Sequence, residues 1–210
     1  NIKHMSYRRF IINSHLKNCF LPLSNDELPI YDLGGKKSKK TYNLNNKNLF
    51  EGSNLKIINN DISEKPDILG DAENLPFNDN SIGSLIFLET IQYLKNPKRS
   101  LDEVLRVLKI GGRAAISFPL MYNELEDHTD RYRFTFKFIS ENLDKFKIRK
   151  ILNCGGIFGS IGQFTQSKSY DSKGLKRILL YYFSIACFIF DIMINNFEGK
   201  NSFTNGYIVL

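Results

Sequence analysis

Residues 101–113 read Leu-Asp-Glu-Val-Leu-Arg-Val-Leu-Lys-Ile-Gly-Gly-Arg, a helical pattern that runs into two glycines. Four apolar side chains follow the i, i+3, i+4, i+7 spacing of a helix with one buried face: Leu101, Val104, Leu105 and Leu108. Asn96 and Pro97 precede this helix and are typical of an N-cap and a first helical turn. Gly111 and Gly112 are expected to end it.

Apolar runs on both sides of this helix predict the strands of one sheet. They cover residues 29–35, 55–59, 68–70, 82–88, 113–118, 148–152 and 205–210. Further helices are expected at residues 6–20, 135–146 and 155–200. Because strands alternate with helices along most of the chain, the sequence predicts an α/β fold with a mainly parallel sheet. Ligands of such sheets bind beyond the carboxyl ends of the strands.

The composition is that of a globular protein, with 42% hydrophobic and 24% charged residues among 210. We expect one domain over residues 1–210, in which residues 1–4 resemble a cloning remnant before Met5.

The three cysteines form no Cys-x-x-Cys pair, which argues against a disulfide framework or a zinc site and favours a reducing, cytoplasmic location. The three histidines are too far apart to predict a metal site, and no signal-peptide pattern is present.

Charge is distributed unevenly along the chain. Residues 1–56 hold 10 basic and 4 acidic side chains, residues 57–130 hold 7 and 13, and residues 131–210 hold 12 and 5. A nucleic-acid-binding surface requires positive charge clustered on one face. An acidic middle between basic flanks therefore does not predict a nucleic-acid partner.

Three aspartates lie at or just beyond the ends of successive predicted strands. Asp32 lies inside the first strand, Asp61 follows the second and Asp71 follows the third. Each alone could be an ordinary loop aspartate. Together they favour a ligand site, because carboxylates in these positions line the ligand edge of an open sheet. The one after the second strand can accept hydrogen bonds from a ribose diol.

Several segments share motifs with one family. The quoted stretches are Ile30-Tyr-Asp-Leu-Gly-Gly35, Asp71-Ala-Glu-Asn-Leu-Pro-Phe77, Leu85–Pro97 and residues 101–113. Residues 29–118 thus resemble a class I S-adenosylmethionine-dependent methyltransferase of the small bacterial type. Asp130-Arg-Tyr-Arg-Phe-Thr135 is similar to a motif of methyltransferase-like proteins linked to cell-surface polysaccharide synthesis, and residues 206–210 resemble their closing strand.

This resemblance implies a fold, an activity and a cofactor. The fold is a Rossmann-like, seven-strand, mainly parallel sheet with an antiparallel last strand and helices on both faces. The implied activity is methyl transfer from S-adenosylmethionine to a small or saccharide-linked acceptor, with S-adenosylhomocysteine as product. The implied cofactor-binding residues are Asp32, Gly34, Gly35, Asp61, Asp71, Ala72 and Leu88.

The glycine loop departs from the usual family pattern, Asp-x-Gly-x-Gly-x-Gly. Lys36 and Ser38 stand where the later glycines belong, and Lys36 can instead pair with the cofactor's carboxylate. Two functions stay open on this feature: an active methyltransferase, or a methyltransferase-like scaffold that has lost cofactor binding and acts as a binding or partner module. An oxidoreductase is disfavoured, because no Gly-x-Gly-x-x-Gly opens a helix after the first strand.

The loop after the fifth predicted strand holds the candidate catalytic and substrate-binding residues. His128 titrates near neutral pH and lies between Asp127 and Asp130, so His128 and Asp130 are the expected catalytic residues. Tyr132 and Arg133 can hold a phosphate or carboxylate of the acceptor. The alternative for His128 is a solvated acidic loop that holds a histidine by chance. The alternative for Tyr132 and Arg133 is that they pack the loop against the next helix.

Residues 155–200 are additional to a minimal methyltransferase. They include a broad apolar stripe: Leu179, Tyr182, Phe183, Ala186, Phe190 and Met193. We expect a helix that lies in the core or contacts a second copy of the chain. A membrane-surface helix over residues 178–194, with Lys173, Lys176 and Arg177 near headgroups, is an alternative. A true span is disfavoured, because the clean apolar run of 13 residues ends before Asp191.

Overall fold

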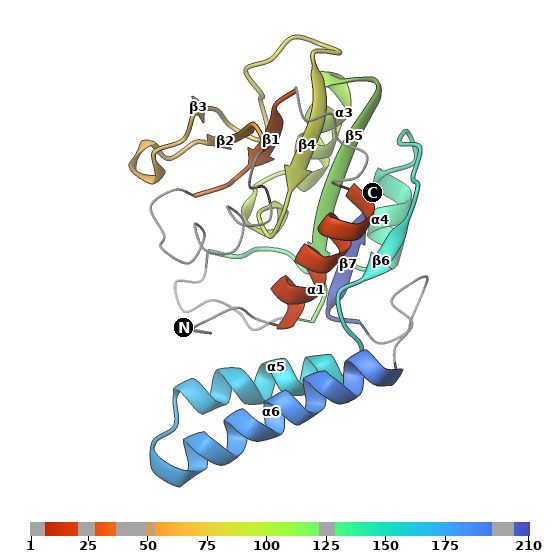
Figure 1. Ribbon diagram of the computed structural model, residues 1–210. Coiled ribbons are helices and arrows are strands. Elements are labelled where there is room, and N and C mark those ends of the chain that lie inside the picture. Colours follow the sequence, from red (N-terminus) through yellow and green to blue (C-terminus); the bar gives the residue numbers. More distant parts are fainter. Residues whose placement is uncertain (1–6, 21–27, 37–49, 51–52, 122–128, 195–203) are drawn as a thin grey trace.

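The computed structural model describes residues 7–20, 28–36, 50, 53–121, 129–194 and 204–210 (Figure 1). These residues form a seven-stranded sheet in the order β3-β2-β1-β4-β5-β7-β6. The strands are β1 (Ile30–Leu33), β2 (Leu55–Asn59), β3 (Ile68–Leu69), β4 (Ile82–Phe87), β5 (Leu108–Pro119), β6 (Ile151–Asn153) and β7 (Gly206–Val209). Strands β1 to β5 pair in parallel, and β7 runs antiparallel to both β5 and β6. The predicted mainly parallel sheet with an antiparallel last strand is confirmed.

Helices cover both faces of this sheet, with α1 on one side and α3 and α4 on the other (Figure 1). The longer helices are α1 (Tyr7–His15), α3 (Pro97–Val107), α4 (Phe136–Asn142), α5 (Ile157–Tyr170) and α6 (Gly174–Ile194). A π-helical turn, η1 (Leu16–Phe20), continues α1, and two 3₁₀ turns are η3 (Ile62–Glu64) and η4 (Ile91–Tyr93). The helix predicted at residues 6–20 is therefore confirmed as α1 and η1.

Strand β4 shows how the two faces are filled. Leu85 and Phe87 belong to an apolar cluster that also contains residues of α3 and α4. Ile86, between them, belongs to a second cluster that contains Ile12 and Leu16 from the α1 side. Successive side chains of a strand point to opposite faces, and both faces are buried here. This double burial explains why the strand reads as a continuous apolar run.

Helix α3 begins where predicted but ends early. The Asn96 side chain accepts a hydrogen bond of 3.1 Å from a first-turn backbone N–H, as expected of an N-cap. The expectation that Gly111 and Gly112 end the helix was wrong, because α3 stops at Val107. Leu108 is buried and already pairs with β4 as the first residue of β5. The strand register then shifts near Gly111, whose φ of +79° favours glycine.

Two later boundaries also differ from the sequence prediction. Helix α4 covers only part of the predicted 135–146 helix, and Phe146 lies in a turn that still packs against the core. Strand β6 starts at Ile151 rather than at residue 148. The backbone N–H groups of Arg149 and Lys150 both bond the Leu210 carbonyl, so the regular strand pairing begins only after them.

Helices α5 and α6 form a hairpin at the carboxyl edge of the sheet, below the strands in Figure 1. Strand β6 runs parallel to β5, so its end and the residues leading into α5 lie at the edge where the parallel strands end. Tyr7 attaches the hairpin to α1, the helix that covers one face of the sheet. Its hydroxyl donates to Asp191 Oδ2 at 2.8 Å, and its ring stacks on Phe188 with centroids 4.5 Å apart.

Candidate functional site

Strand β1 ends in a glycine turn that lies directly against the loop after β4. Gly34 has a φ of +82°, and its N–H donates to the Ile58 carbonyl at 2.7 Å. A Cβ atom at Gly34 would lie 2.2 Å from Thr90 Cγ2. Both the left-handed backbone and this close approach require glycine. The turn therefore brings the ends of β1 and β4 together.

Asn59, the last residue of β2, links the glycine turn after β1 to the residues that follow β2. Its side-chain amide donates to the Gly35 carbonyl at 2.8 Å, and its Oδ1 accepts from the Asp61 N–H at 2.9 Å. The side chain is buried, so both bonds are protected from water. Asn59 is not among the site residues predicted from the sequence, although a polar residue that ends an apolar strand could have pointed to it.

Asp61 is exposed and faces the short turn η3. Its Oδ1 accepts from the Ser63 N–H at 2.8 Å. Hydrogen bonding by the Ser63 side chain, and to a lesser degree by this N–H, lowers the pKa of the Asp61 carboxyl. Lys36 reaches the same turn and pairs with Glu64 at 3.1 Å. The lysine that replaces a family glycine thus lies beside Asp61, where its charge also lowers the Asp61 pKa.

The loop after β3 begins at Asp71 and is folded on itself. Asp71 Oδ1 accepts from the Glu73 N–H at 2.9 Å, and Ala72 is buried. Glu73 in turn accepts from the N–H groups of Lys95 and Asn96, at 2.8 and 2.9 Å. These bonds join the Asp71 loop to the loop that follows β4.

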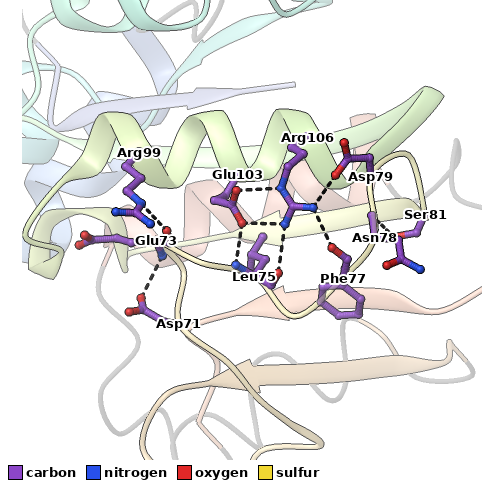
Figure 2. Close-up of polar contacts among 10 residues, drawn as sticks. All are labelled: Asp71, Glu73, Leu75, Phe77, Asn78, Asp79, Ser81, Arg99, Glu103 and Arg106. Carbon is purple, nitrogen blue, oxygen red and sulfur yellow. Dashed lines mark hydrogen bonds and ion pairs between the residues drawn. The ribbon is translucent and has the colours of Figure 1, made fainter.

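Two charged residues of α3 hold the rest of this loop from behind (Figure 2). Glu103 accepts from the Leu75 N–H at 2.7 Å. Arg106 donates to the carbonyls of Phe77 and Leu75, at 2.8 and 3.1 Å, and pairs with Asp79 at 2.7 Å. Because Glu103 and Arg106 bond backbone groups of the loop, α3 helps to define its path.

Asp32 is a buried carboxyl near the carboxyl end of β1, between β2 and β4. It is 2% exposed, and its Oδ2 has no hydrogen-bond partner among the described residues. Burial raises the pKa of Asp32 to about 7, although the charge of Arg9 opposes this shift. A carboxyl in this state favours a cationic neighbour, because a cation stabilises its ionised form.

Glu89 follows β4 and was not selected from the sequence. Arg8 of α1 donates to both of its carboxylate oxygens, at 2.8 and 3.1 Å, and the Ser117 hydroxyl donates to Oε1 at 2.8 Å. Glu89 also has a φ of +53°, which is uncommon for a residue with a side chain. An acidic residue directly after an apolar strand is the signal that could have revealed it.

The segment after β5 is anchored beside the same edge. Asp130 and Arg133 pair with each other at 2.5 Å, and the Tyr132 hydroxyl donates to the Lys95 carbonyl at 3.0 Å. His128 lies outside the described residues. The structure thus brings Asp130, Tyr132 and Arg133 next to the loop after β4, with the arginine already engaged by an acidic partner.

The predicted cofactor residues lie at the ends of neighbouring strands. Gly34 and Gly35 follow β1, Leu88 follows β4 and is buried, and Asp61 follows β2. Among the residues that the structure describes, no three His, Cys, Asp or Glu side chains are grouped to hold a metal ion.

Residues 47–116 match the family model described as a methyltransferase domain. This stretch includes β2, the Asp71 loop, β4 and α3, whereas β1 and the glycine turn after it lie outside it.

One third of the chain is therefore similar to the methyltransferase family.

One curated relative has a similar stretch of sequence. It is the demethylmenaquinone methyltransferase of Paenarthrobacter aurescens, which is 43% identical over 56 residues. The match covers 25% of this chain and 22% of the relative, so the chain matches about a fifth of that protein's length.

Solved structures share the methyltransferase fold at low sequence identity. A SAM dependent methyltransferase from Archaeoglobus fulgidus has a TM-score of 0.56 at 12% identity, over 96% of this chain and 92% of that one. The [4+2]-cyclase SpnF has a TM-score of 0.56 at 15% identity, over 96% and 79%. A Haemonchus contortus phosphoethanolamine N-methyltransferase, in complex with phosphomonomethylethanolamine and S-adenosylhomocysteine, has a TM-score of 0.53 at 12% identity, over 94% and 50%. At these identities the likeness shows the fold.

Proposed function

We propose that this methyltransferase domain binds S-adenosylmethionine at the carboxyl edge of β1 and β2 and transfers its methyl group to a small or saccharide-linked acceptor. The observation that most supports cofactor binding is Asp32, a buried carboxyl with an oxygen that lacks a partner among the described residues. The amino group of S-adenosylmethionine is a cation that fits this need. When bound, the cofactor supplies a methyl group on a sulfonium, and S-adenosylhomocysteine is released.

The other strand-end residues fit the remaining parts of the cofactor. Asp61 is exposed and ionised, so its carboxylate can accept from the ribose hydroxyls. The turn at Gly34 and Gly35 presents backbone without a side chain to the methionine end. Asp71, Ala72 and Leu88 border the place of the adenine, with Asp71 near its amino group.

The acceptor is proposed to bind at the segment after β5. His128 and Asp130 are proposed to position the attacking group and take its proton, and Tyr132 and Arg133 to hold a phosphate or carboxylate. In-line transfer depends mainly on alignment of the nucleophile. The neighbour that holds phosphomonomethylethanolamine supports a small, anionic acceptor. If the role of His128 is right, His128→Ala lowers turnover by about 10²-fold and leaves cofactor affinity nearly unchanged.

We place this reaction in the cytoplasm. Cys154 and Cys187 are both free and buried, as suits a reducing compartment.

A second candidate function is favoured by Lys36. This lysine stands where the family usually has a glycine. Its side chain pairs with Glu64 and places a positive charge near Asp61. A domain altered in this way can serve as a scaffold that has lost cofactor binding and acts as a binding or partner module.

Calorimetry with S-adenosylmethionine and S-adenosylhomocysteine distinguishes the two functions. The methyltransferase gives measurable binding, and Asp61→Ala weakens it by roughly 1–3 kcal/mol, the scale of a hydrogen bond to a charged group. Asp171→Ala, an exposed aspartate between α5 and α6, is the matched control and leaves affinity unchanged. Absence of heat from the unaltered protein at millimolar ligand would favour the scaffold.

A further inference from the structure

The α5–α6 hairpin has small and polar residues inside and large apolar residues outside. Its buried residues include Ser160, Gly162 and Ser169 of α5 and Ser184 and Cys187 of α6. In contrast, its most exposed apolar side chains lie along α6: Leu175, Leu179, Tyr182, Phe183, Ile189 and Met193, at 53–76% exposure. A helix of a water-soluble protein normally buries its apolar side chains, so this arrangement is reversed.

The two helices approach each other through their backbones. A Cβ atom at Gly162 would lie 3.0 Å from the Ser184 carbonyl oxygen and 2.5 Å from the Phe188 ring. Small residues at a helix–helix seam are typical of packing in lipid, where large apolar side chains face outward. Phe188 and Phe190 of α6 still pack against α5, but the most exposed large side chains of α6 are left free to contact something else.

Charge on the exposed part of the hairpin has one dominant sign. Asp191, the single acidic residue of α6, is buried and accepts hydrogen bonds from the Tyr7 hydroxyl and the Gly156 N–H, both 2.8 Å long. Around the turn between the helices, four exposed cations surround one exposed aspartate, Asp171: Lys168, Lys173, Lys176 and Arg177. A surface of this kind is complementary to anionic lipid headgroups.

We propose that the α5–α6 hairpin docks this domain on an anionic lipid bilayer, with α6 lying in the interface and the basic turn contacting headgroups. By length and composition, α6 is the one helix among the described residues that could cross a membrane. Its partner α5 has 14 residues and reaches only about 21 Å, which is short of the roughly 30 Å of hydrocarbon. A hairpin that lies in the interface satisfies both the apolar face and the charged turn.

Vesicle flotation of the full chain tests this proposal. We expect co-flotation with vesicles of phosphatidylglycerol and phosphatidylcholine, weaker binding to pure phosphatidylcholine, and release as salt increases. Replacing Leu179, Tyr182 and Phe183 together by serine should reduce partitioning more than 10-fold. Ile110→Ser is the matched control, because Ile110 is 98% exposed and lies far from the hairpin in the chain. That control should bind normally.

A second variant separates charge from apolar contact. Lys176→Gln with Arg177→Gln should reduce binding to anionic vesicles by roughly 5-fold for each cation and hardly affect binding to neutral ones. The proposal is overturned if the unaltered chain floats with neither vesicle, or if the triple serine variant binds as well as the unaltered chain. It is also overturned if sedimentation in lipid-free buffer shows a stable dimer that the triple variant dissociates, because a second copy then covers this face.

Discussion

Gly206 leaves room for the guanidinium of Arg8: a Cβ atom at Gly206 would lie 2.2 Å from Arg8 Nη1 and 2.3 Å from the Phe118 carbonyl oxygen. Arg8 is 1% exposed and crosses from α1 to Glu89 after β4. The glycine that opens β7 is therefore part of the reason that the ion pair can be buried.

Gly206→Ala should destabilise the protein by roughly 2–4 kcal/mol, because the added methyl group displaces a buried charge from its partner. Gly174→Ala is the control. Gly174 also has a positive φ, +56°, but a Cβ atom added there would have no heavy atom within 4 Å, so only about 1 kcal/mol of backbone strain is expected. Urea denaturation measures both, and equal losses would contradict this account.

Arg8→Met should cost about 3–5 kcal/mol, because it leaves Glu89 largely buried without its cation. Adding Glu89→Gln should recover part of that loss, because the uncompensated charge is then removed. A double-mutant cycle in urea measures the coupling. If the two single losses simply add, the pair is not a coupled unit.

The stability contributed by Glu89 should depend on pH. Burial alone raises its pKa, but the charge and hydrogen bonds of Arg8 outweigh burial and lower it below the ordinary value of 4.5. A carboxyl with a lowered native pKa stabilises the fold above about pH 4.5 and loses that contribution as pH falls through its native pKa. The stability gap between the unaltered chain and Glu89→Gln should therefore be full at pH 7 and shrink below pH 4.5. A gap that is constant with pH would contradict the lowered pKa.

Asp32 should show the opposite dependence. Its native pKa of about 7 exceeds the ordinary value of 3.8, so the native state holds an extra proton between these values and stability falls as pH rises through that range. Asp32→Asn should then match the unaltered chain near pH 4 and be more stable by roughly 1–3 kcal/mol at pH 8. It should also weaken S-adenosylmethionine binding at pH 8. A variant that loses stability at pH 8 would show that the carboxylate already has a good partner.

Arg106→Met should loosen the Asp71 loop without touching a ligand. We expect a lower melting temperature and a roughly 10-fold weaker affinity for S-adenosylmethionine, because one side chain holds the carbonyls of both Leu75 and Phe77. Lys109→Met, at an exposed cation near the start of β5, is the control. A normal affinity at temperatures well below melting would limit Arg106 to a role in stability.

Local patterns in the sequence predict much of this fold, because strands and caps are local. The Asn96 cap and the strand 55–59 are found at the predicted residues. The end of α3 could not be predicted in the same way. Gly111 and Gly112 are good helix stops, but Leu108 gains a strand partner and burial in β5, and this tertiary contact overrides the local signal.

The candidate site was predictable only in part. Strand-end aspartates are visible in the sequence, because strand ends follow from apolar runs. The ion pair of Arg8 with Glu89 joins residues 81 positions apart, and no spacing rule connects them. Asn59 was missed for a related reason, since its hydrogen bond to the Gly35 carbonyl depends on how β1 and β2 lie side by side.

Helix α1 has two neighbouring residues with distant targets. Tyr7 is bonded to Asp191 in the hairpin, and Arg8 is bonded to Glu89 beside the glycine turn. Two adjacent residues of α1 therefore connect the hairpin to the loop that follows β4. The hairpin and the loop after β4 are therefore linked through one turn of α1, by a route that does not pass through the sheet.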